Sequence, residues 1–170
     1  MMSEENIFNI EKYLLNGIIV DTNLLILFLI GIYDSRYISK FKITCKYSEE
    51  DFKILKDIVK GFKKIIITPH IVAELSNLSM KIPENRLKEY FKYFIEILKK
   101  SDEINIDKNS ILLNKYIDKI GVTDVGIMLA SENNEFLFIT DDFQLANISF
   151  SKGLPVINFN HIREFLWFGR

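Results

Sequence analysis

The chain has 170 residues and a formal net charge of −1 at neutral pH, and 48% of its residues are hydrophobic. This length suits one domain rather than two, and the charge balance excludes a uniformly basic nucleic-acid binder. Cys45 is the only cysteine, so no disulfide can form within the chain, which fits a reducing cytoplasm. Residues 1–5 lack the basic start of a signal peptide, and the longest apolar run falls well short of the roughly 20 residues that span a bilayer. We therefore expect a cytoplasmic protein without a membrane segment.

Strands are predicted where short apolar runs show no alternation of polar and apolar residues. Such runs are typical of parallel strands that are buried on both faces. In chain order they cover residues 18–20, 65–67, 136–139 and 156–159.

Helices are predicted before, between and after these strands from helical spacing of apolar residues and from end signals. Ser48 and Asp51 form a capping box, and Thr68 is an N-cap that precedes Pro69 at the first helical position. In chain order the helices cover residues 6–16, from 24, from 48, 69–80, 86–100, 111–120, 123–132, 143–149 and from 161. The alternation predicts an α/β protein whose parallel sheet, of about four to five strands, is covered by helices on both faces.

Acidic residues follow the predicted strands or begin the predicted helices. The candidate catalytic acids are Asp21, Glu74, Asp124, Asp141 and Asp142. Ligand sites of open parallel sheets gather outside the carboxyl ends of the strands, so we expect these side chains to converge. Clustered carboxylates favour a hard cation such as Mg²⁺ or Mn²⁺, and four of them balance the charge of a two-metal phosphodiesterase site. For each aspartate taken alone, a helix cap or a helix-dipole partner is the alternative interpretation.

Four segments that contain these acids resemble the signature blocks of PIN-domain ribonucleases, in that family's order. They are IIVDTN at 18–23, TPHIVAELSNL at 68–78, GVTDVGIMLA at 121–130 and LFITDDF at 137–143. The resemblance implies a three-layer α/β/α fold and RNA cleavage that depends on Mg²⁺ or Mn²⁺. Many members of the family are toxins of toxin–antitoxin pairs, and dimers are frequent. An RNA substrate, a second copy of the chain and an antitoxin protein are therefore the expected partners.

The resemblance also assigns roles to single residues. Asp21, Glu74 and Asp124 match the first three metal-binding acids of the family, and its T-x-D pattern selects Asp142 as the fourth. Asp141 occupies the middle position of that pattern, so which of the two aspartates points inward stays open. Supporting polar roles are expected of Thr22, Asn23, Asn77 and Thr140.

The chain departs from small toxin members of the family at two places. Residues 1–17 form a predicted helical extension, and residues 34–64 form an insertion with a lysine-rich helix within a single domain at 1–170. These additions weigh against the toxin role more than against the nuclease role.

Lysines on the helix of the insertion are candidates for contacts with nucleic acid. Lys53, Lys56, Lys60 and Lys63 recur at helical spacing and could contact phosphates. The alternative is a solvated helix face on which Asp57 pairs with Lys53. Before this helix, Lys46 and Tyr47 are among the basic and aromatic residues that could add contacts to bases.

Three functional hypotheses follow. The first is a metal-dependent endoribonuclease, and its main alternative is a non-catalytic PIN-fold subunit that binds RNA or protein. The third is a phosphohydrolase with Asp21 as its nucleophile. Because Asn23 stands where that chemistry needs a second acid, the third hypothesis is disfavoured.

Overall fold

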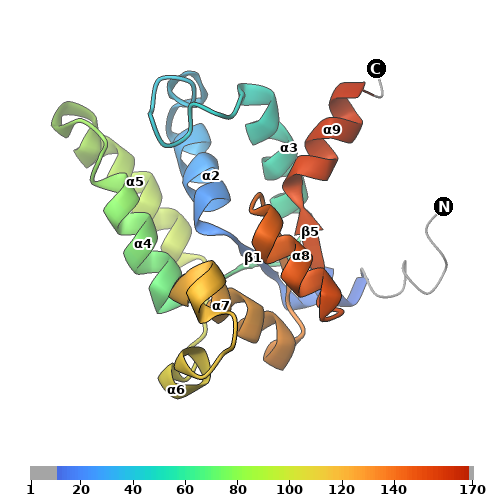
Figure 1. Cartoon of the computed structure of the whole chain (residues 1–170). Helices are drawn as coiled ribbons and strands as arrows, with labels where there is room; N and C mark the ends of the chain where they lie inside the picture. The colour runs from blue at the N-terminus through green and yellow to red at the C-terminus, as the bar shows by residue number, and fades with distance from the viewer. Residues whose placement is uncertain (1–10, 169–170) are drawn as a thin grey trace.

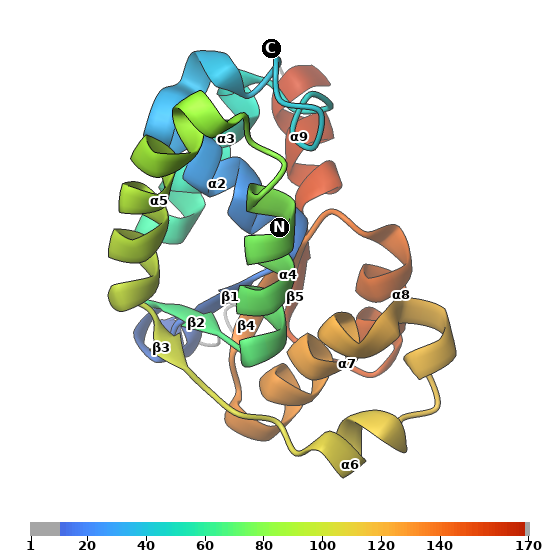
Figure 2. The same ribbon diagram turned by 90° about the vertical axis from the view of Figure 1, so that its left-hand side faces the viewer.

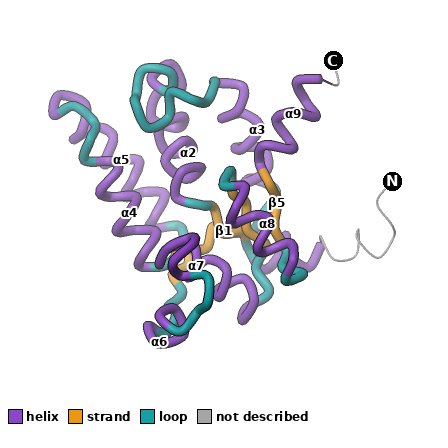
Figure 3. The backbone as a smooth tube through the Cα atoms, in the orientation of Figure 1, coloured by secondary structure: helices purple, strands orange, loops and turns teal. Residues whose placement is uncertain are grey.

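A five-stranded, all-parallel sheet lies at the centre of the molecule. The computed structural model describes residues 11–168, and the strand order is β3-β2-β1-β4-β5 (Figure 1). The strands are β1 (Ile18–Val20), β2 (Ile65–Ile67), β3 (Asp102–Glu103), β4 (Leu137–Thr140) and β5 (Val156–Asn158). Helices surround these strands (Figure 3), which confirms the predicted three-layer α/β/α class.

The helices divide between the two faces of the sheet according to the crossover to which they belong. Helices that connect β1, β2 and β3 pack together on one face: α2 (Thr22–Asp34), α3 (Glu49–Lys60), α4 (Pro69–Ser79) and α5 (Glu84–Lys99). Helices before and after β4 lie on the other face (Figure 2): α7 (Ile117–Asn134) and α8 (Phe143–Ser151). Three shorter or terminal helices complete the described chain: η1 (Ser35–Tyr37), α6 (Lys108–Leu112) and α9 (Phe159–Phe168).

Helix α2 is the centre of the core. All its residues from Leu24 to Ile30 are buried, because α2 packs against α3, α4, α5 and β4. Gly31 allows α3 to approach closely, since a Cβ atom there would lie 2.1 Å from the ring of Phe52 on α3. The apolar run is therefore a core helix. Between residues 11 and 168, no helix is both long enough and apolar enough to cross a membrane.

The insertion packs as a folded part of the core. Its loop is closed by Thr44, whose hydroxyl donates to the carbonyl of Ile38 at 2.8 Å. The predicted capping box at the start of α3 is confirmed: Ser48 accepts from the Asp51 amide, and the Asp51 carboxylate accepts from the Ser48 amide.

The sequence missed one strand and placed one helix wrongly. Strand β3 was missed because Asp102–Glu103 is a short, charged, exposed edge strand without the apolar signature. The predicted helix at 111–120 is divided, since α6 ends at Leu112 and α7 begins at Ile117. The expected break at Gly121 is present as a kink between two helical stretches of α7, where the glycine adopts φ 81° and ψ 175°. Of the predicted helix at 6–16, only residues 11–16 are described, and they are helical.

Candidate acidic site

The centre of the sheet contains a topological switch point. Strands β1 and β4 pair in parallel, with Val20 opposite Ile139, yet the chain leaves β1 toward β2 and returns to β4 on the other side. Helices α2 and α8, which follow these strands, therefore cover opposite faces, and ligand sites of such sheets are found outside the carboxyl ends of these two strands. Asp21 follows β1, and Asp141 and Asp142 follow β4, so three of the five candidate acids lie at this switch point.

Asp21 is buried at the switch point and held by hydrogen bonds. Its side chain is the N-cap of α2, and Oδ1 accepts from the Asn23 amide at 3.1 Å. Oδ2 accepts from the hydroxyl of Thr140, which itself accepts from the Asp142 amide at 3.0 Å. Burial, together with the charges of Asp141 and Glu74, raises the pKa of Asp21 to about 6.

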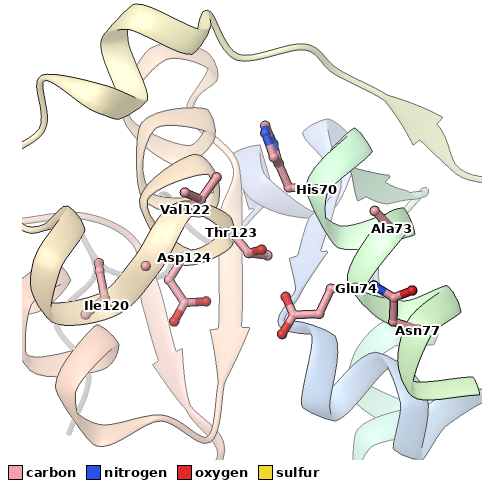
Figure 4. Close-up of a pocket in the computed structure, with 9 residues that line it drawn as sticks. His70, Ala73, Glu74, Asn77, Ile120, Val122, Thr123 and Asp124 are labelled. Carbon is pink, nitrogen blue, oxygen red and sulfur yellow. The ribbon is translucent and has the colours of Figure 1, made fainter. Parts of the chain in front are cut away.

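Glu74 and Asp124 face each other across a cleft between α4 and α7 (Figure 4). The cleft has a volume of about 380 Å³, and Asn77 and His70 line the wall on the α4 side. Glu74 accepts from the hydroxyl of Thr22 at 3.2 Å. Burial, together with the charges of the other four candidate acids, raises the pKa of Asp124 to about 8. The five acids therefore form one electrostatically coupled group, which we call the acidic site.

Asp141 and Asp142 have different surroundings. The exposed Asp142 is the N-cap of α8, and its Oδ1 accepts from the amides of Gln144 and Leu145 at 2.7 and 2.9 Å. Asp141 turns inward, with a side chain only 6% exposed, and its Oδ1 is buried without a hydrogen-bond partner. The family pattern selected Asp142, whereas the buried position belongs to Asp141.

The predicted supporting residues are at the site in different ways. Thr22 and Thr140 donate to the carboxylates of Glu74 and Asp21. Asn77 lies one turn beyond Glu74 and lines the same cleft. Asn23 contributes its backbone amide to Asp21, and the residue itself is exposed.

The donors of the acidic site suit a hard cation, because they are carboxylate oxygens and one of them, Asp141 Oδ1, is buried and unpartnered. Their arrangement is not that of a preformed metal cage. In the part of the chain that the structure describes, no three His, Cys, Asp or Glu side chains stand together as a group that could hold a metal ion. The acids interact through their charges without sharing one coordination point.

The predicted lysine stripe does not run along the acidic site. Lys53 lies 3.6 Å from Glu50 rather than pairing with Asp57, and Lys56 stands over the ring of Phe52, 5.5 Å from its centre. Lys60 is the last residue of α3, and Lys63 follows just before β2. The acids lie past the carboxyl ends of the strands. Lys63 and its end of the stripe lie at the amino ends of the strands, on the opposite side of the sheet.

Sequence reasoning underestimated Lys46 and Tyr47. Both side chains bind Asp141 Oδ2, each at 2.6 Å. The sequence offered only their basic and aromatic character as a signal. Their contact with Asp141 joins segments 95 and 94 residues apart, which no local spacing indicates.

Comparison with known proteins leaves the function to be argued from the site: no protein-family model matches the chain, and no curated protein is significantly similar to it.

Proposed function

We propose that this chain is a metal-dependent endoribonuclease of the PIN-domain type. The observation that carries the proposal is the convergence of five carboxylates, from four separate segments, at the switch point of a parallel sheet. The four sequence blocks that resemble PIN-domain ribonucleases contain these acids, and RNA is the substrate which that resemblance implies.

Structural roles account for only part of the acidic site. Asp21 and Asp142 cap helices, which explains an acid at each position without any catalysis. Asp124 caps no helix, and across residues 11–168 its side chain has no hydrogen bond or ion pair, although burial and four neighbouring acids raise its pKa to about 8. An acid whose ionisation is opposed in this way, at the wall of a cleft, supports a functional role.

A divalent cation fits the chemistry of these donors. Asp21, Glu74 and Asp124, with either Asp142 or the inward Asp141, would hold Mg²⁺ or Mn²⁺, which when bound lowers the pKa of a water molecule and stabilises the leaving oxygen. The chain itself supplies orientation. Thr140 and the Asn23 amide fix both oxygens of Asp21, and Thr22 directs Glu74 toward the cleft.

Cleavage of total cellular RNA in the presence of Mn²⁺ tests the proposal. We expect Asp21→Asn and Asp124→Asn each to reduce cleavage by at least about 100-fold, since loss of even an outer-shell partner costs 10- to 100-fold. Asparagine preserves the cap at position 21, so the fold should survive. Asp107→Asn, which changes the equivalent cap of α6, is the matched control. Cleavage that resists EDTA, or full activity in both variants, would contradict the proposal.

One observation favours the alternative of a non-catalytic subunit that binds RNA or protein. Within the described residues no three-ligand group stands ready for a metal ion. Titration calorimetry of the wild-type chain with Mn²⁺ separates the two proposals, because the nuclease requires binding that Asp124→Asn weakens. A chain that binds RNA but no Mn²⁺ would support the alternative.

A further inference from the structure

Lys46 brings a positive charge into the acidic site. Its ammonium group lies 2.6 Å from Asp141 Oδ2, and the loop before α3 brings it there. Between residues 11 and 168, no other lysine or arginine forms an ion pair with any of the five acids. Lys46 is therefore the basic group that the fold gives to this site.

The ammonium group stands at the boundary between the buried acid and the solvent. The Lys46 side chain is 54% exposed, whereas that of Asp141 is 6% exposed. A lysine has three N–H donors, and the bond to Asp141 uses one of them. Two donors remain for a ligand that enters from solvent.

Buried neighbours support this position. Tyr47, which is 3% exposed, donates its hydroxyl to the same oxygen of Asp141 at 2.6 Å. Burial and the charge of Asp141 hold the pKa of Tyr47 far above its usual range, so the hydroxyl stays protonated and remains a donor. The Tyr47 ring packs against the Lys46 ammonium at 4.9 Å and the Arg163 guanidinium at 5.5 Å. The loop that carries Lys46 is thus held in place by the buried side chain of the next residue, Tyr47.

The lysine stripe offers no equivalent. Lys53 is directed to Glu50, Lys56 packs on Phe52, and Lys63 lies at the far edge of the sheet. A phosphodiester that approaches this group of acids meets repulsion from the ionised ones unless cations offset it, and among the lysines and arginines of the described residues Lys46 is the one that forms an ion pair with the group.

We propose that Lys46 contacts the substrate phosphate of this site, with its free N–H donors binding a non-bridging oxygen of a single-stranded RNA backbone. The inference rests on the proposed function, because it places the phosphodiester at the acidic site. It assigns phosphate recognition to one residue of the insertion and removes it from the stripe on α3.

The test measures RNA binding separately from cleavage. All variants are made in the Asp124→Asn background, and binding of a labelled single-stranded RNA is followed by fluorescence anisotropy over a range of salt concentrations. Loss of one phosphate contact reduces the magnitude of the negative slope of log K against log salt by about 0.7 for a single strand. We expect that decrease in Lys46→Met and recovery of the slope in Lys46→Arg.

Lys152→Met is the matched control. Lys152 is also ion-paired, to Glu132 at 3.4 Å, but it lies at the carboxyl end of α8, whereas the acids lie at the amino end. Its slope should equal that of the parent. A purely structural role of Lys46 would lower the thermal midpoint without changing the slope.

The outcomes separate this inference from the proposed function. An unchanged slope in Lys46→Met, or no RNA binding by the parent, overturns the role of Lys46. Calorimetry on the wild-type background should show that Lys46→Met still binds Mn²⁺, and loss of that binding would also overturn the inference, because Lys46 would then act through the metal site. If the wild type cleaves no RNA and binds no Mn²⁺, the proposed function fails, while the salt slope still reports on Lys46.

Discussion

At the scale of single residues, Asp124 is the clearest case of a side chain whose charged form destabilises the folded chain. The carboxyl is largely buried beside four other acids, and both effects oppose its ionisation. Its pKa is about 8 in the folded chain against 3.8 for an isolated aspartate. The folded state therefore retains a proton that the unfolded state releases.

Replacing Asp124 by Asn should change how stability depends on pH. Because the folded pKa is raised, the contribution of Asp124 to stability is fully present below about pH 4 and is lost as the pH rises to about 8. In EDTA we expect Asp124→Asn to melt at the wild-type temperature at pH 4. At pH 8 it should melt at least 2–4 °C higher, the shift that about 1 kcal/mol produces in a domain of this size.

The comparison requires thermal melts of both chains across this pH range, with Asp107→Asn as a control for the loss of a carboxylate elsewhere. Equal melting temperatures at pH 8 would show that Asp124 is not electrostatically destabilised.

At the scale of elements, the junction between β4 and α8 combines a helix start with the site. Asp142 caps α8 through two backbone amides, while its charge is among those that raise the pKa of Asp124. Thr140, the last residue of β4, joins Asp21 and the Asp142 amide through one hydroxyl. The carboxyl end of one strand therefore sets the positions of two acids.

Two substitutions at Asp142 should separate its roles. Asp142→Ala removes the cap and should cost about 1 kcal/mol of unfolding free energy, whereas Asp142→Asn keeps the cap and should cost only a few tenths. If Asp142 also holds the cation, both variants should lose affinity for Mn²⁺ to a similar degree. Urea unfolding and titration calorimetry measure the two effects, and unchanged Mn²⁺ affinity in Asp142→Asn would leave Asp142 with the capping role alone.

At the scale of the whole molecule, the carboxyl-terminal helix supports the insertion, and the insertion supports the site. Helix α9 lies beside α3 (Figure 1), and Arg163 binds the fully buried Asp51 through both carboxylate oxygens, at 2.8 and 3.0 Å. Asp51 belongs to the capping box with Ser48 that starts α3, and Tyr47 directly precedes this box in the chain. The segment that positions Lys46 is thus fixed by Arg163, which lies 112 residues after Asp51 in the chain.

Breaking this link should destabilise the entire domain. Arg163→Met leaves the buried carboxylate of Asp51 without its cation, and we expect a loss of about 3–5 kcal/mol in urea unfolding. Arg36→Met is the control, because Arg36 is 82% exposed in its pair with Asp34 and should change stability by no more than about 0.5 kcal/mol. Equal unfolding curves for the two variants would mean that the buried pair contributes nothing beyond a surface pair.

Local patterns predicted much of this architecture. The apolar, non-alternating runs at 18–20 and 65–67 are strands because a parallel sheet buries both of their faces, and that signal is contained in the runs themselves. The capping box at Ser48 was equally predictable, since its two partners are only three residues apart in the chain. The charged strand Asp102–Glu103 could not be predicted from local patterns, because only its pairing with β2 makes it a strand.

The sequence by itself determined that this is an α/β protein with acids placed after several of its strands, because both features depend on residues close together in the chain. Tertiary structure alone decided that Asp141 turns inward while Asp142 caps a helix, since adjacent residues of the same type carry no signal that separates them. It also decided that Lys46 joins the acidic site, across 95 residues of chain. The physical reason is the same in both cases: hydrogen bonds and ion pairs depend on distance in space, which local sequence spacing does not encode.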